Sequence, residues 1–185
     1  MIYKFNVKSN IYYFDGENLQ LYKEFISEQN EKTALRWEKE EKVLNKAILM
    51  VANACNGKCI YCYEDHGTFG RKNALMEKET ADKIIEYICE RYIKVRKIAF
   101  FGGEPTLNYP IIKYVVEKLK GKVQVDSYEI TSNAVLMTEE MISLFKENNF
   151  KVIISLDGPA EIHNSLRIGC SHFKVVQIID CTIVK

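Results

Sequence analysis

The sequence predicts an α/β protein with a parallel sheet, and two observations lead to that prediction. From residue 46 onward, apolar segments of strand length alternate with segments of helical periodicity. Strands that alternate with helices build parallel sheets with right-handed crossovers. Most of these strands also lack polar alternation, which is typical of strands covered on both faces.

Four strands and at most four helices are expected in this region. The predicted strands are residues 46–54, 95–103, 123–133 and 151–159. The predicted helices are residues 76–93, 108–122 and 137–150, and residues 171–184 begin a fourth helix or an apolar strand. Gly121 is expected to end the second helix. Thr138 is the expected N-cap of the third, because a side-chain oxygen there accepts a hydrogen bond from the first turn.

The first 45 residues differ from the rest and predict a small α+β segment. Residues 2–7 and 10–16 are aromatic and apolar enough to form two short strands. Residues 19–46 are rich in charge, with apolar residues at helical spacing, and predict one or two helices. We therefore divide the chain into an N-terminal segment, residues 1–45, and an α/β region, residues 46–185.

Composition and charge exclude several classes of protein. The 185 residues carry 26 basic and 25 acidic side chains, a net charge of +1, so the basic excess of a nucleic-acid-binding protein is absent. No apolar run reaches membrane-spanning length, and the first residues lack the apolar core of an export signal. The expected compartment is the cytoplasm. Thiols stay reduced there, so clustered cysteines indicate metal binding or catalysis before disulfides.

Three cysteines form such a cluster. Cys55, Cys59 and Cys62 make the pattern C-x3-C-x2-C, which six cysteines placed at random would form roughly 0.003 times. A structural zinc site would need a fourth ligand, and His66 is the nearest candidate. A [4Fe–4S] cluster normally takes four cysteines, so three leave one iron with an open position, as in catalytic metal sites. The isolated cysteines Cys89, Cys170 and Cys181 are expected to be small buried side chains.

Unusual residues also follow each predicted strand. The segments "NACNGKCIYC", "GGEPT", "TSN" and "SLDGP" come at the four strand ends, while the strand bodies are mostly apolar. The carboxyl ends of parallel strands lie at one edge of a sheet, where ligands bind in such folds. We therefore expect these four segments to build one site.

These motifs together resemble the radical S-adenosylmethionine (SAM) superfamily. "FFGGEPTLN" is similar to its GGEP motif, and "ITSNAVLMTEE" to its Thr-Asn-Gly segment, with Ser132-Asn133-Ala134 in place of the commoner residues. "ISLDGPAEIHNSLR" resembles the subgroup that contains anaerobic sulfatase-maturating enzymes and SPASM-type peptide maturases. The resemblance covers residues 46 to about 178 and implies an incomplete (β/α) partial barrel with parallel strands. Residues 1–45 resemble the leading segment of some peptide maturases but are short for a complete leader-peptide-binding module, so the resemblance implies a remnant of one.

The resemblance also implies a set of ligands and partners. Cys55, Cys59 and Cys62 would bind a [4Fe–4S] cluster whose fourth iron takes SAM. The SAM contacts it implies are Tyr61 at the adenine, Gly102, Gly103 and Glu104 at the amine, Ser132 and Asn133 at the ribose or amino-acid part, and Ser155 and Arg167 at the carboxylate. It implies reductive cleavage of SAM to a 5′-deoxyadenosyl radical, a peptide or protein substrate, and an electron donor such as a flavodoxin or ferredoxin. The resemblance does not indicate which residue of this chain, if any, is catalytic.

Taken singly, most of these residues have simpler explanations. Asp157-Gly158-Pro159 alone is a turn, and Arg167 alone is a surface cation. The chain also departs from the family, because only four of its usual six βα units are expected and no cysteine-rich C-terminal extension follows. The sequence therefore predicts a truncated radical SAM enzyme. The alternative is a non-catalytic fragment that binds a cluster without turnover.

Overall fold

The computed structural model describes residues 2–7, 10–15, 20–22 and 42–183. The chain divides into two compact units, Met1–Glu41 and Lys42–Lys185. In the first unit, β1 (Ile2–Val7), β2 (Asn10–Asp15) and β3 (Gln20–Tyr22) form an antiparallel sheet in that order. The two predicted strands are therefore present. The helix expected to begin at residue 19 is wrong over β3, and the rest of the helical prediction, with Trp37, falls on residues 23–41, outside those described.

β3 forms because the chain returns alongside β2. Tyr22 pairs with Tyr13, and Gln20 pairs with Asp15. β2 already pairs with β1 along its other edge, so β3 satisfies backbone groups that β2 would otherwise leave open. This non-local pairing overrides the helical spacing of the apolar residues that follow residue 19.

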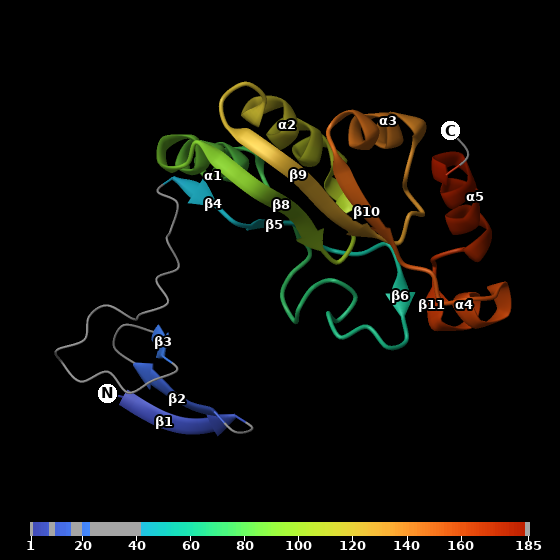
Figure 1. Ribbon diagram of the computed structural model, residues 1–185. Helices are drawn as coiled ribbons and strands as arrows, with labels where there is room; N and C mark the ends of the chain where they lie inside the picture. The colour runs from blue at the N-terminus through green and yellow to red at the C-terminus, as the bar shows by residue number, and fades with distance from the viewer. Residues whose placement is uncertain (1, 8–9, 16–19, 23–41, 184–185) are drawn as a thin grey trace. The chain divides into compact units, whose positions relative to one another are not determined.

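The second unit contains a sheet of mostly parallel strands (Figure 1). Its strand order is β10-β9-β8-β5-β7, and β4 pairs with β8 beside β5. The parallel strands are β4 (Val43–Leu44), β5 (Ala47–Asn53), β8 (Lys94–Gly102), β9 (Gln124–Ser132) and β10 (Phe150–Ile154). The short β7 (Ala74–Leu75) runs antiparallel at one edge, and β10 forms the other. Among the described residues the sheet does not close, so the predicted incomplete parallel barrel is confirmed.

Helices connect these strands as the alternation predicts. They are α1 (Lys78–Arg91), α2 (Tyr109–Leu119) preceded by the short η1 (Pro105–Asn108), α3 (Glu139–Glu147) and α5 (His172–Ile183). Thr138 caps α3, because its hydroxyl oxygen accepts a hydrogen bond from the Met141 N–H at 3.3 Å. α2 ends just before Gly121, whose φ of +77° is a left-handed conformation that suits glycine. The ambiguous last segment is a helix.

The prediction of at most four helices was wrong, because α4 (Ala160–Leu166) is a further helix. This helix has seven residues and shows no long apolar face; Ile162, on its surface, is 51% exposed. It is held instead by His163, which is fully buried and bonds to backbone on both sides. Such anchoring by a polar side chain leaves no periodic signal in the sequence.

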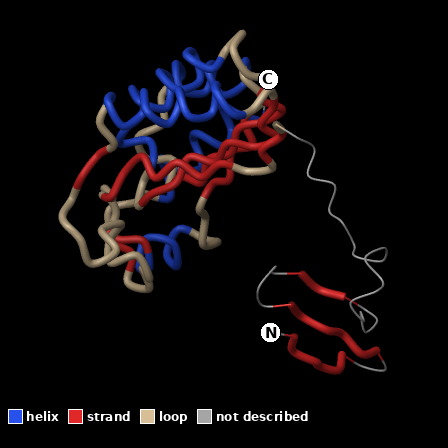
Figure 2. The backbone as a smooth tube through the Cα atoms, turned by 90° about the vertical axis from the view of Figure 1, so that its left-hand side faces the viewer, coloured by secondary structure: helices blue, strands red, loops and turns tan. Residues whose placement is uncertain are grey.

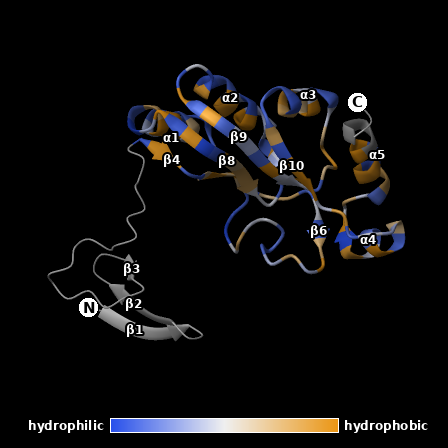
Figure 3. Cartoon of the chain, in the orientation of Figure 1, coloured by the Kyte–Doolittle hydropathy of each residue, from blue (hydrophilic) through white to orange (hydrophobic). Residues whose placement is uncertain are grey.

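The core lies between the sheet and one layer of helices. α1, α2 and α3 cover the same face of the sheet, and Figure 2 shows most of the helices on one side of the strands. Ile98, Phe100, Ile130, Val115 and Leu119 are among the buried residues between these layers. In Figure 3 hydrophobic and hydrophilic residues alternate along β8 and β9, as expected for strands with one covered face.

The expectation that both faces of the sheet are covered was wrong for the described residues. Ile48 and Met50 of β5 are 62% and 40% exposed on the face opposite the helices. In a partial barrel this inner face lines the lumen, and apolar side chains there need not be packed by helices. No helix among the described residues is long and apolar enough to cross a membrane.

Candidate functional site

The four strand-end segments meet at one pocket, as the sequence predicts. The loop after β5 brings the cysteines, and the ends of β8 and β9 bring the glycines, Glu104 and the Ser132–Asn133 pair. Ser155 follows β10, and Arg167 begins β11 (Arg167–Ile168). All eleven predicted residues line this pocket: Cys55, Cys59, Tyr61, Cys62, Gly102, Gly103, Glu104, Ser132, Asn133, Ser155 and Arg167.

The glycine turn after β8 is tightly packed against backbone. Gly102 has a φ of +149°, and a Cβ there would lie 2.2 Å from the carbonyl oxygen of Ala52. A Cβ on Gly103 would lie 2.4 Å from the Cα of Gly67, which belongs to the cysteine loop. The turn is therefore a place where two backbone segments touch without side chains between them. Gly67 is a lining residue that sequence reasoning missed, because its contact lies 36 residues further along the chain.

Glu104 joins three parts of the site and is almost fully buried, at 1% exposed. Its Oε1 accepts hydrogen bonds from the Thr106 N–H at 3.0 Å and the Ser132 hydroxyl at 2.8 Å. Its Oε2 accepts the Asn133 N–H at 2.7 Å. The carboxylate thus ties the end of β8 to the end of β9. Each carboxylate oxygen has two lone pairs, so Oε2 retains capacity for a ligand amine in the pocket.

Replacing Glu104 by glutamine should destabilise the fold. The amide presents N–H donors on one side, so at least one of its backbone or hydroxyl donors loses its acceptor inside the protein. We expect a loss of about 2 kcal/mol in the free energy of unfolding, the cost of a broken buried bond to a charged group. Chemical denaturation of both proteins measures it, with Glu117→Gln on the α2 surface as the control. Equal stability of Glu104→Gln and the unaltered chain would contradict this account of the carboxylate.

The cysteine loop is docked onto the segment that carries Arg167. β6 (Lys58–Cys59) pairs antiparallel with β11, and Cys59 is directly opposite Arg167. The Ile60 N–H donates to the Leu166 carbonyl oxygen at 2.9 Å, which extends this pairing. Segments more than 100 residues apart in sequence therefore hold one cysteine and one cation side by side.

Hydrogen-bond donors approach the cysteine sulfurs. The Gly57 N–H donates to Cys55 Sγ at 3.3 Å, and Asn133 Nδ2 lies 3.9 Å from the same sulfur. Arg167 Nη1 lies 4.0 Å from Cys59 Sγ. Thiolate ligands of iron–sulfur clusters accept such bonds, which tune their charge. The donor set therefore fits thiolates that bind a cluster.

The charges around Cys55 also favour a cationic partner. Burial raises the pKa of the Cys55 thiol, the Gly57 N–H opposes that rise, and Glu104, Cys59 and Cys62 add negative potential that raises the pKa further. An anionic thiolate is costly here unless positive charge is supplied. Bound iron would supply it, because a coordinating thiol loses its proton outright.

A single-ion zinc site does not fit this geometry. Among the described residues, no three His, Cys, Asp or Glu side chains are placed to hold one metal ion together. His66, the possible fourth ligand, is exposed and does not line the pocket. A zinc ion needs four ligands converging within about 2.3 Å. A cluster of several irons places each cysteine on a different iron and needs no such convergence.

The isolated cysteines were predicted to be small buried side chains, and the two whose side chains the structure describes agree with this. Cys89 is half-buried against the core, and Cys170 is buried, at 2% exposed. Burial and the nearby cluster cysteines raise the pKa of Cys170 to about 12, so it stays a neutral thiol at ordinary pH. The side chain of Cys181 lies outside the described part of the chain.

Comparisons with known proteins agree with this fold. The family model of the radical SAM superfamily matches residues 49–181. The chain therefore belongs to the radical SAM superfamily. It is 34% identical over 149 residues to the radical SAM cyclopropyl synthase TigE of Paramaledivibacter caminithermalis, covering 70% of this chain and 30% of that enzyme. It is 30% identical over 135 residues to a cysteine-type anaerobic sulfatase-maturating enzyme of Clostridium perfringens, covering 69% of this chain and 36% of the enzyme.

Solved structures show the same relationship. Native anSMEcpe with bound AdoMet superposes with a TM-score of 0.65 at 28% identity, covering 75% of this chain and 40% of that one. Native anSMEcpe with bound AdoMet and the Cp18Cys peptide gives a TM-score of 0.62 at 26% identity, covering 76% and 39%. The resemblance to the sulfatase-maturating subgroup is thereby confirmed. The chain spans well under half the length of these relatives.

Proposed function

We propose that this chain is a radical SAM enzyme that modifies a peptide or protein. In this proposal Cys55, Cys59 and Cys62 bind three irons of a [4Fe–4S] cluster, and SAM binds beside them. When bound and reduced, the cluster supplies the electron that cleaves SAM to methionine and a 5′-deoxyadenosyl radical. The observation that carries the proposal is the convergence of all three cysteines with the glycine turn, Glu104 and Arg167 on one pocket.

The protein's own residues then have distinct tasks. Gly102 and Gly103 let the backbone approach a ligand closely, and Glu104 offers a buried carboxylate to the SAM amine. Ser155 and Arg167 provide a donor and a cation for the SAM carboxylate, a pairing that arginine suits well. Ser132 and Asn133, which line the same pocket, would contact the ribose or amino-acid part. Tyr61 supplies an aromatic ring for the adenine.

The names of the similar proteins support the proposed kind of substrate. Sulfatase-maturating enzymes and a peptide-bound structure of one are among the similar proteins, which supports a peptide or protein substrate. We propose that an electron donor such as a flavodoxin or ferredoxin reduces the cluster, and that the protein works in the cytoplasm, where thiols remain reduced.

Electron paramagnetic resonance tests the proposal most directly. The protein is reconstituted with iron and sulfide without oxygen, reduced with dithionite, and measured with and without SAM. We expect a reduced [4Fe–4S] signal whose g-values shift when SAM is added, because SAM occupies the open iron. S-adenosylhomocysteine, which lacks the sulfonium charge, serves as a comparison ligand.

The two other outcomes separate the alternatives. A cluster signal that does not change when SAM is added favours the alternative, a non-catalytic fragment that binds a cluster without turnover. The absence of any cluster signal would overturn the metal assignment itself. Formation of 5′-deoxyadenosine under the same conditions then distinguishes binding from catalysis.

A further inference from the structure

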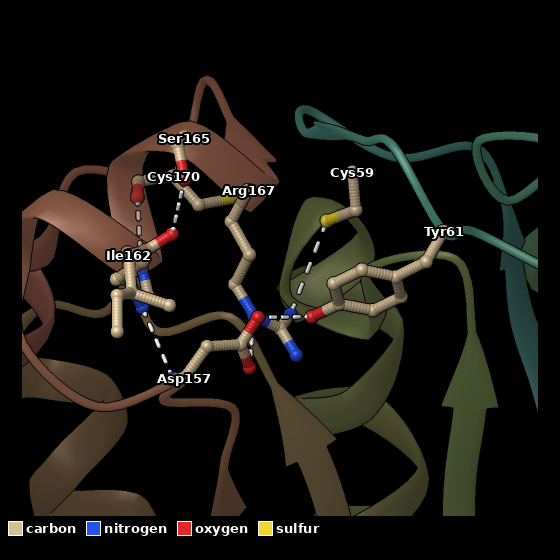
Figure 4. Close-up of polar contacts among 8 residues, drawn as sticks. Cys59, Tyr61, Asp157, Ile162, Ser165, Arg167 and Cys170 are labelled. Carbon is tan, nitrogen blue, oxygen red and sulfur yellow. Dashed lines mark hydrogen bonds and ion pairs between the residues drawn. The ribbon is translucent and has the colours of Figure 1, made fainter.

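The function proposed above gives Asp157 no role. Its carboxylate nevertheless contacts both Tyr61 and Arg167, which do have roles in that function. Asp157 follows β10 in the turn "LDGP" and does not line the pocket. Its Oδ2 accepts a hydrogen bond from the Tyr61 hydroxyl, and its Oδ1 lies 2.9 Å from Arg167 Nε. Figure 4 shows the carboxylate between the Tyr61 hydroxyl and the Arg167 side chain. One turn thus connects the cysteine loop with β11.

Tyr61 and Arg167, the two partners of Asp157, also contact each other. The guanidinium carbon of Arg167 lies 5.5 Å from the centre of the Tyr61 ring, within cation–π range. The Arg167 side chain is largely buried, at 16% exposed, and the Asp157 side chain at 19%. At that degree of burial, a charge contact is screened far less than one on an open surface.

The way Asp157 contacts Arg167 leaves the pocket side of the guanidinium available. Arginine has five N–H donors, and Asp157 forms an ion pair at Nε, the nitrogen nearest the stem, although the Nε–H is not aligned for a hydrogen bond. Nη1 lies 4.0 Å from Cys59 Sγ at the pocket. The contact at Nε holds the Arg167 side chain and so fixes the direction of its two terminal nitrogens. A ligand carboxylate would accept hydrogen bonds from both of these nitrogens at once.

Asp157 is itself held by a buried histidine. The Asp157 N–H donates to His163 Nδ1 at 3.3 Å, and His163 Nε2 lies 2.8 Å from the Cys170 carbonyl oxygen. A carbonyl only accepts, so Nε2 carries the proton and Nδ1 is the acceptor. This neutral tautomer satisfies both bonds and fixes the backbone from which the carboxylate projects.

The charge balance agrees with this geometry. Burial works to raise the pKa of the Asp157 carboxyl, but the Tyr61 hydrogen bond and the Arg167 guanidinium outweigh it and leave the pKa below its usual value. The carboxylate is therefore charged near pH 7, as its ion pair with Arg167 requires.

We propose that Asp157 is a positioning residue that holds Arg167 and Tyr61 in place for the carboxylate and adenine of SAM. Without it, the long Arg167 side chain would regain rotamer freedom, and SAM binding would have to order it again. The inference rests on the proposed function, because it presupposes that the pocket takes SAM.

Asp157→Asn tests the proposal while keeping the shape of the side chain. We expect SAM to bind about tenfold more weakly, the effect of losing one charge-assisted contact. The dissociation constant is measured by titrating SAM into the reconstituted, reduced protein and following the paramagnetic resonance signal. Iron and sulfide contents should equal those of the unaltered protein. Asp126→Asn, which removes a carboxylate 3.0 Å from Lys94 at the opposite end of β9, is the matched control and should bind SAM normally.

A double-mutant cycle distinguishes positioning from a general structural effect. If Asp157 acts through Arg167, then Asp157→Asn should have little further effect on SAM affinity in an Arg167→Gln background. Additive losses would overturn the proposal, and so would Asp157→Asn binding SAM as tightly as the unaltered protein. Failure of the unaltered protein to respond to SAM would instead overturn the proposed function, and the inference with it.

Tyr61→Phe keeps the test decisive if Asp157→Asn takes up no iron. This variant removes the hydroxyl bonded to Asp157 and keeps the ring beside Arg167. We expect SAM to bind about threefold more weakly, the effect of one lost hydrogen bond at a partly exposed site. Unchanged affinity in Tyr61→Phe would overturn the proposal.

Discussion

Replacing Cys59 with alanine should abolish cluster assembly, whereas replacing Cys89 should leave it intact. Cys59 lines the pocket beside Cys55 and Cys62, and Arg167 lies against its sulfur. Cys89 is half-buried in α1 and packs against the core, away from the pocket. With three thiolates available, a cluster has no spare ligand, so losing one leaves two irons without a protein ligand.

Iron and acid-labile sulfide after anaerobic reconstitution measure this effect. The Cys59→Ala protein should retain almost none of either, and its reduced signal should vanish. Cys89→Ala should match the unaltered protein in both contents and lose only the stability expected for a half-buried thiol, about 1 kcal/mol. Equal iron contents in the two variants would contradict the assignment of the cluster to the C-x3-C-x2-C motif.

A second large effect is expected at the glycine turn after β8. Gly102→Ala should destabilise the protein by about 3–5 kcal/mol, because the new Cβ would meet backbone that cannot move aside. That Cβ would lie 2.2 Å from the Ala52 oxygen and 3.0 Å from the Ala52 carbonyl carbon. Since β5 and β8 pair at this point, relief of the clash would also shift the cysteine loop.

Gly121→Ala is a matched control for backbone strain. Gly121 also has a positive φ, +77°, but a Cβ there meets nothing within 4 Å. It should cost about 1 kcal/mol, the penalty for placing alanine in a left-handed conformation. Thermal and chemical denaturation of the two variants compare strain alone with strain plus backbone contact. If both lose the same stability, the close approach of Gly102 to Ala52 is not what requires glycine.

The local pattern of the sequence was enough to predict most of the second unit. Apolar strand segments and amphipathic helices alternate there, and each signal is contained within ten to twenty residues. The site was predictable for the same reason. Parallel strands bring their carboxyl ends to one edge, so motifs that follow successive strands, such as the cysteine loop and "GGEPT", meet without further information.

Contacts between distant segments were not predictable in this way. β3 forms by pairing with β2, Gly67 packs on Gly103, and α4 depends on a buried His163. Each of these depends on two segments whose meeting the tertiary structure decides, and neither segment alone carries a periodic signal. The open inner face of β5 is a similar case, because an apolar strand has the same composition whether one or both faces are covered.

Asp157 shows the difference within a single motif. The letters "LDGP" determine a turn, because aspartate, glycine and proline each favour one for local reasons. Its partners Tyr61 and Arg167 lie 96 residues before it and ten residues after it in the sequence. Sequence by itself thus determined the alternation of strands and helices, the cysteine motif and the residues gathered at the strand ends. Only the tertiary structure decided which carboxylate holds which cation and ring, because that depends on packing between segments with no local relationship.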